Sequence, residues 1–142
     1  ISKAIDINAH KDSIRFALSQ VDQWKNWYPG ADTMSLIRID GKSALENKRS
    51  GQVIYVKSVT DSTVITEYSG TSLKNSTSGW NIISSPAPNT YTLQWYMDIK
   101  LKWYPWEKFS GLLMEKRYGP VMETGLDRLK KRLEKSVDTA HL

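Results

Sequence analysis

The residues that could carry acid–base or nucleophilic chemistry are few and far apart in this chain of 142 residues. Its two histidines are His10, at the start of a predicted helix, and His141, beside the last residue. A catalytic pair must converge to hydrogen-bond distance, so we expect neither histidine to be catalytic. The chain has no cysteine, which excludes disulfides, thiolate zinc sites and cysteine nucleophiles. Since no cluster of His, Asp and Glu has metal-ligand spacing, we predict no metal and no cofactor.

Two carboxylates could face a pocket. Asp98 falls on the polar side of a long alternating strand, so we expect it to be solvated. Glu67 is ambiguous, because Ile65 and Tyr68 compete for the inner face of its strand. A buried Glu67 could serve as a general acid or base, whereas the usual burial of glutamate favours an exposed position.

The aromatic residues are the most informative set, with six Trp and seven Tyr. Such side chains give a cavity wall apolar area plus a few polar groups from Tyr O–H and Trp N–H. We therefore predict ligand-binding residues at Tyr55, Tyr68, Trp80, Trp95, Met97, Trp103 and Met122. For each residue singly the alternative is core packing. We expect Trp24 and Trp27 to pack short helices against the rim of a sheet.

A series of strands must position these side chains. Alternation and turn signals predict strands at 2–8, 33–39, 42–47, 52–59, 63–69, 71–84 and 91–103. The last of these alternates strictly over thirteen residues, with its odd-numbered positions apolar. We therefore predict one buried face and one solvated face for it, and a bend, because a strand of about 40 Å must coil with its sheet.

Three helices complete the pattern. The first opens at Asn8 or Ala9, and a second short helix runs from Gln20 to Tyr28, where Pro29-Gly30 ends it. The longest runs from 106 to about 135. Its apolar side chains recur at helical spacing, at Phe109, Leu112, Leu113, Met122, Leu126, Leu129 and Leu133.

Glycine and proline interrupt this last helix. Gly119-Pro120 is predicted to kink it or split it in two. Gly111 and Gly125 each cost about 1 kcal/mol relative to Ala inside a helix. We expect close contact with the sheet, or room for a ligand, to require them.

The order of elements predicts an α+β fold and not an alternating α/β fold. The length suits one domain covering 1–142. We predict a curved antiparallel sheet of six to seven strands around the long C-terminal helix, with two short helices after the first strand and an apolar pocket between sheet and helix. The chain starts at Ile1, without Met, inside a predicted strand, so we expect that an N-terminal segment is missing, either a signal peptide or an anchor.

Charge and hydropathy limit the possible partners. The net charge is +5, and basic residues gather between Lys108 and Lys135. This region could face nucleic acid or anionic lipid, but a solvated helix face with pairs such as Asp127–Lys131 is the simpler interpretation. We predict no nucleic-acid partner. Residues 75–97 lack charge, but Asn, Ser, Thr, Gly and Pro interrupt them too often for a membrane-spanning helix.

Four segments, in this order and spacing, resemble the START / birch-pollen-allergen-like (SRPBCC) superfamily, and more narrowly its bacterial polyketide cyclase/dehydrase-like branch. They are Ile5-Asp6-Ile7-Asn8-Ala9 with Ile14 and Phe16; Trp24-Lys25-Asn26-Trp27-Tyr28-Pro29; Thr92-Leu93-Gln94-Trp95; and Gly125-Leu126-Asp127-Arg128-Leu129-Lys130. The resemblance covers nearly the whole chain. It implies the helix-grip fold and a cavity for lipids, sterols, polyketides or other apolar molecules. It does not imply a shared reaction.

Three functions follow as alternatives. The first is binding or transport of a hydrophobic small molecule without catalysis. The second is a polyketide cyclase or hydratase, for which Glu67, Tyr55 and Tyr68 are the candidate catalytic groups. The third is a regulatory or interaction module that is fused to another domain or tethered to a membrane through the missing segment. The location stays open between the cytoplasm and a membrane anchor in a bacterium, and the sequence does not predict the oligomeric state.

Overall fold

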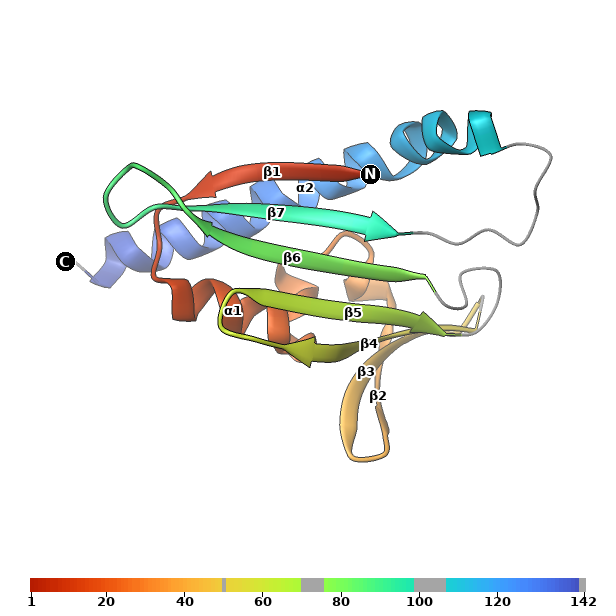
Figure 1. Cartoon of the computed structure of the whole chain (residues 1–142). Helices are drawn as coiled ribbons and strands as arrows, with labels where there is room; N and C mark the ends of the chain where they lie inside the picture. The colour runs from red at the N-terminus through yellow and green to blue at the C-terminus, as the bar shows by residue number, and fades with distance from the viewer. Residues whose placement is uncertain (50, 70–75, 99–106, 141–142) are drawn as a thin grey trace.

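The computed structural model describes residues 1–49, 51–69, 76–98 and 107–140. Within the last helix it describes side chains at residue 116 and at 118–135. In this part of the chain, seven antiparallel strands form one sheet in the order β1-β7-β6-β5-β4-β3-β2. The long helix α2 (Glu107–Ala140) runs beside β1 and β7, while the N-terminal helix α1 (Lys11–Ser19) lies against β5 and β6 (Figure 1). The predicted α+β helix-grip architecture is confirmed.

The remaining elements follow the predicted order closely. The strands are β1 (Ser2–Ile7), β2 (Ser35–Ile39), β3 (Lys42–Asn47), β4 (Gln52–Val59), β5 (Thr63–Ser69), β6 (Thr77–Ser84) and β7 (Tyr91–Asp98). Two 3-10 helices, η1 (Val21–Asn26) and η2 (Ala31–Thr33), follow α1. The predicted strand at 33–39 begins two residues late, because Gly30 takes a φ of +86° and leads into the η2 turn.

The alternation in β7 is confirmed where it is described. Leu93, Trp95 and Met97 are buried on the concave face, and Asp98 is exposed as expected. Residues 99–103 of the predicted strand, including Trp103, lie outside the described residues, as do residues 71–75 of the strand predicted at 71–84.

Of the two outcomes predicted at Gly119-Pro120, the split is wrong, since α2 is one continuous helix through Pro120, and the kink stays a prediction. A proline inside a helix removes one backbone hydrogen bond and strains the preceding turn. Packing offsets this cost, because Met122, Leu126 and Leu129 directly after the proline are fully buried against the sheet. Their burial holds the two halves of the helix in one element.

Polar side chains tie together the convex face of the sheet. Thr63 donates to the Asn81 side chain at 3.3 Å, and Asn81 donates to Gln94 at 3.2 Å, so one hydrogen-bonded row crosses β5, β6 and β7. Near the edge, Thr92 donates to Asp6 on β1 at 2.6 Å. Such cross-strand pairs stabilise a solvated sheet face, which leaves the concave face for the core.

Candidate ligand-binding cavity

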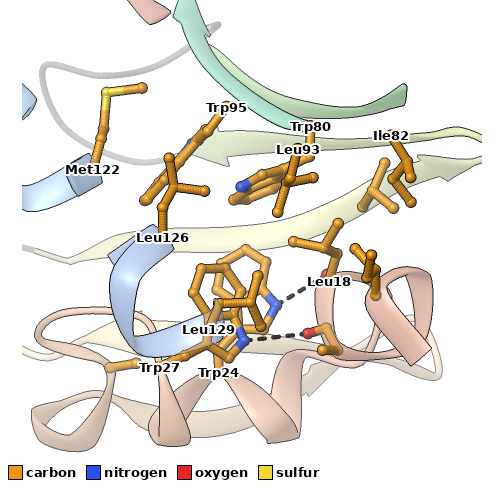
Figure 2. Close-up of a cluster of buried hydrophobic side chains, with 14 of the residues drawn as sticks. Leu18, Trp24, Trp27, Trp80, Ile82, Leu93, Trp95, Met122, Leu126 and Leu129 are labelled. Atoms are coloured by element: carbon orange, nitrogen blue, oxygen red, sulfur yellow. Dashed lines mark hydrogen bonds between the residues drawn. The ribbon is translucent and has the colours of Figure 1, made fainter. Parts of the chain in front are cut away.

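The centre of the concave face is an aromatic cluster with very little free space. Trp80 and Trp95 stack with ring centroids 5.2 Å apart, and Trp24 meets Trp80 edge-on at 5.6 Å. Figure 2 shows the Trp24 and Trp27 indoles pointing to α1. Their N–H groups donate to backbone carbonyl oxygens of that helix, Trp24 at 3.0 Å and Trp27 at 3.3 Å. The expectation that these two residues pack the short helices against the sheet is confirmed.

Gly125 brings α2 into direct contact with this cluster. A β-carbon at this position would lie 2.9 Å from a ring carbon of Trp95 and 3.1 Å from Pro29. A side chain would therefore push the helix away from the sheet. Close contact with the sheet, one of the two reasons expected for a glycine inside this helix, therefore explains Gly125. The side chains around Gly111 are not described.

One helical turn before Gly125, the space between helix and sheet opens into a cavity of about 340 Å³. The loop after η1, the strands β3, β4, β5 and β7, and α2 all contribute to its wall. The lining residues are Tyr28, Pro29, Gly30, Thr33, Met34, Asn47, Gln52, Ile54, Tyr68, Trp95, Met97, Tyr118 and Val121. These residues are all uncharged, so the described wall combines apolar surface with neutral hydrogen-bonding groups.

Two tyrosine hydroxyls meet at this wall. The Tyr28 and Tyr68 oxygens lie 3.5 Å apart, and either can donate to the other. Behind them, the Trp95 indole N–H donates to the Ser78 hydroxyl at 2.6 Å. Ser78 itself is fully buried on β6, where its register partners are Thr66 on β5 and Met97 on β7. Two hydrogen-bonded pairs, Tyr28–Tyr68 and Trp95–Ser78, thus lie at and behind the cavity wall.

Burial keeps both tyrosines protonated. Loss of solvent raises the pKa of Tyr28 well above its ordinary value, and the neighbouring Tyr68 raises it further. Loss of solvent also raises the pKa of Tyr68, although hydrogen bonds from Tyr28 and Ser78 partly oppose the shift. At neutral pH both groups are therefore neutral hydrogen-bond donors and acceptors, and neither is a base.

The structure brings three of the seven predicted ligand-binding residues to this cavity: Tyr68, Trp95 and Met97. Trp80 and Met122 are fully buried in the core cluster beside it. Tyr55 lies on the opposite, convex face, and Trp103 lies outside the described residues. A ligand-binding role for these seven residues stays a prediction, and the geometry favours the first three.

The candidate catalytic groups separate in the same way. Strand register places Tyr55 opposite Glu67, and this pair faces away from the Tyr68 side of the sheet. Glu67 forms an ion pair with Lys57 at 3.3 Å. Partial burial raises the pKa of Tyr55, and the nearby Glu67 adds to that shift. Of Glu67, Tyr55 and Tyr68, only Tyr68 lines the cavity.

Several lining residues were not predicted from the sequence. The sequence predicts Pro29 and Gly30 only as the end of a short helix. In the structure they line the cavity themselves, and the turn that they form places Tyr28, Thr33 and Met34 at its wall. The signal that could have found them is their place at the end of the segment Trp24-Lys25-Asn26-Trp27-Tyr28-Pro29, which carries part of the family resemblance.

The described residues show neither a metal site nor a spanning helix. They contain no group of three or more His, Cys, Asp or Glu side chains placed to hold a metal ion. None of the helices, where described, is long and apolar enough to cross a membrane.

Residues 1–134 match the family described as polyketide cyclase / dehydrase and lipid transport. A search of curated proteins found no match.

Solved structures share the fold at low sequence identity. A START superfamily protein from Mycobacterium smegmatis is 19% identical, with a TM-score of 0.68 over 95% of this chain and 97% of that one. The di-domain ARO/CYC StfQ of the steffimycin biosynthetic pathway is 10% identical, with a TM-score of 0.68 over 97% of this chain and 52% of that one. Norcoclaurine synthase from Thalictrum flavum, in complex with dopamine and hydroxybenzaldehyde, is 13% identical, with a TM-score of 0.65 over 95% and 86%.

Proposed function

This chain belongs to the polyketide cyclase/dehydrase and lipid transport family, and on that premise we propose that it binds a hydrophobic small molecule, lipid-like or polyketide-like, in the cavity between sheet and helix. One observation carries the proposal. The aromatic core is closed at Gly125, while directly beside it a cavity of about 340 Å³ remains open. The described side chains leave this space unfilled, which suits a ligand.

The lining matches the chemistry of such a ligand. Ile54, Met97 and Val121 offer apolar contact, and the face of Trp95 offers an aromatic surface. The tyrosine hydroxyls supply a few polar contacts that fix orientation, as is usual in small-molecule sites. The volume lies at the lower end of the range for such sites, roughly 300–1,000 Å³, which favours compact ligands over long acyl chains.

Tryptophan fluorescence tests the proposal directly, because Trp95 belongs to the cavity wall. The protein is titrated with a fatty acid, a sterol and an aromatic polyketide, and the change in emission is followed. We expect at least one class to give a saturable change with one site per chain. A flat response to all three classes would contradict the proposal.

A matched pair of variants locates the binding. Val121→Trp places a bulky ring at the cavity wall, whereas Ile83→Trp adds the same ring at a residue that is also exposed but lies outside the cavity lining. Binding should be lost or weakened at least tenfold in Val121→Trp and unchanged in Ile83→Trp. Equal weakening in both variants would place the ligand elsewhere.

A further inference from the structure

Trp95 makes a buried hydrogen bond behind the cavity wall. Its indole N–H can only donate, and its partner is the Ser78 hydroxyl, 2.6 Å away. This N–H is therefore satisfied within the protein and is not available to a ligand.

The hydroxyls of the two tyrosines differ from the Trp95 N–H. The Tyr28 and Tyr68 oxygens lie 3.5 Å apart at the cavity wall, and either can donate to the other, but a bond between them uses only one of the two protons. The proton of the other hydroxyl can therefore be donated to a ligand in the cavity.

We infer that the paired hydroxyls of Tyr68 and Tyr28 present an O–H donor to the cavity, and that the site selects ligands carrying a carbonyl oxygen over hydrocarbons of the same shape. The inference rests on the proposed function and specifies its ligand class.

The spacing of the two hydroxyls suits this role. Their oxygens are 3.5 Å apart, near the limit for a hydrogen bond, so each keeps most of its donor capacity. A carbonyl oxygen has two lone pairs and can accept from both hydroxyls at about 2.7–2.8 Å. Burial raises the pKa of both tyrosines, which keeps the two protons in place at neutral pH.

A matched pair of compounds measures the preference. Fluorene and 9-fluorenone share one rigid tricyclic shape and differ by a carbonyl group in place of a methylene. We expect 9-fluorenone to bind about tenfold or more tightly than fluorene by calorimetry, because the hydrocarbon leaves the two donors unpaired. Equal affinities of the two compounds would overturn the inference and leave the proposed function standing.

Variants assign the preference to the hydroxyls. Tyr68→Phe and Tyr28→Phe each remove one oxygen and keep the ring, and we expect each to reduce the preference for 9-fluorenone severalfold while fluorene binding changes little. Tyr55→Phe removes a hydroxyl on the convex face and should leave the preference intact. A preference that survives in Tyr68→Phe and Tyr28→Phe would overturn the inference.

The carbonyl stretch of bound 9-fluorenone gives an independent readout. Donation from two hydroxyls should move the infrared band to lower wavenumber in the wild-type complex, and the shift should shrink in Tyr68→Phe. A band at its position in hydrocarbon solvent would contradict donation. Failure of both compounds to bind, together with every class in the fluorescence panel, would contradict the proposed function itself.

Discussion

Two neighbouring regions of the concave face use the same residue types for opposite purposes. Around Trp24, Trp27 and Trp80, the aromatic rings pack against one another and against Leu126 and Leu129 of α2 (Figure 2). Tyr28 and Tyr68 line an open space, and the Tyr28 ring also stacks on Trp24 of the packed region, with centroids 4.9 Å apart. The difference shows that a high aromatic content does not by itself mark a cavity, because the position of the helix decides where space remains.

The polar atoms of the two regions differ in the same way. Trp24 and Trp27 use their N–H groups on the backbone of α1, which locks the packed region. The hydroxyls of Tyr28 and Tyr68 instead meet each other beside the cavity. Trp80 is an exception in the packed region, since its indole nitrogen has no hydrogen-bond partner in the described part of the chain. Trp95 belongs to both regions, because it stacks on Trp80 and also lines the cavity.

Truncation of the packed region should have the largest effect. Trp80→Ala removes a fully buried indole and leaves a cavity inside a closed cluster, which should lower the free energy of unfolding by about 3–5 kcal/mol. Met97→Ala at the cavity wall should cost less, about 2 kcal/mol, because its surroundings are already partly empty. Urea denaturation of both variants measures the two values. Equal losses would mean that the two regions do not differ in packing.

The boundary between the regions can be tested at Gly125. Gly125→Ala gains about 1 kcal/mol of helix propensity, but its methyl group overlaps Trp95, at a cost of about 1–3 kcal/mol. We expect net destabilisation of about 1 kcal/mol by urea denaturation. Thr124→Ala, at the exposed position next to it, is the control and should be neutral or slightly stabilising. A stabilised Gly125→Ala variant would show that close contact with Trp95 does not set this boundary.

Alkaline pH should lower the free energy of unfolding through Tyr28, which lines the cavity. The folded-state pKa of Tyr28 is raised, so above about pH 10 the unfolded chain releases this proton while the folded chain retains it. The stabilising contribution is complete below pH 10 and is lost as pH rises through the folded pKa. The free energy of unfolding should therefore fall more steeply in wild type than in Tyr28→Phe between pH 9 and 11. Parallel curves would contradict burial of the Tyr28 hydroxyl.

The smallest effect is expected at the surface, where α1 is held to the sheet. Asp61 pairs with Lys11 at 2.7 Å and with Arg15 at 3.0 Å, and these cations lower its pKa. Asp61→Asn should reduce the thermal midpoint slightly at neutral pH and low salt. The difference should vanish in high salt, and it should also vanish as pH falls through the lowered pKa, because wild-type Asp61 is then protonated. A difference that persists in high salt would show that the pairing is not what holds α1 at this point.

The fold could be predicted because its signals are local and repeated. Alternation in β7 predicted which of its residues face the core, and Asp40-Gly41, a hairpin-turn signal between the strands predicted at 33–39 and 42–47, indicated the β2–β3 hairpin. The face of Glu67 could not be fixed this way, since Ile65 and Tyr68 compete for the inner side. Strand pairing resolves it, with Tyr68 opposite the buried Ile54.

The cavity wall was harder to predict because it depends on contacts between distant segments. Trp80 and Trp95 carry the same sequence signal, yet only Trp95 reaches the cavity. The separation depends on where α2 crosses the sheet, and Gly125 sets that point. The position of Tyr28 at the cavity wall could not be predicted either, because a residue in a turn has no helical or strand periodicity that indicates where its side chain points.

The central claim is that the open region, and not the packed one, receives the ligand. Intermolecular nuclear Overhauser effects between 9-fluorenone and the methyl groups of the protein test it most directly. We predict contacts to Ile54, Met97 and Val121 at the cavity and none to Ile82 or Leu129 in the packed core. Contacts to Ile37 or Ile83 and none to the three cavity residues would contradict the account.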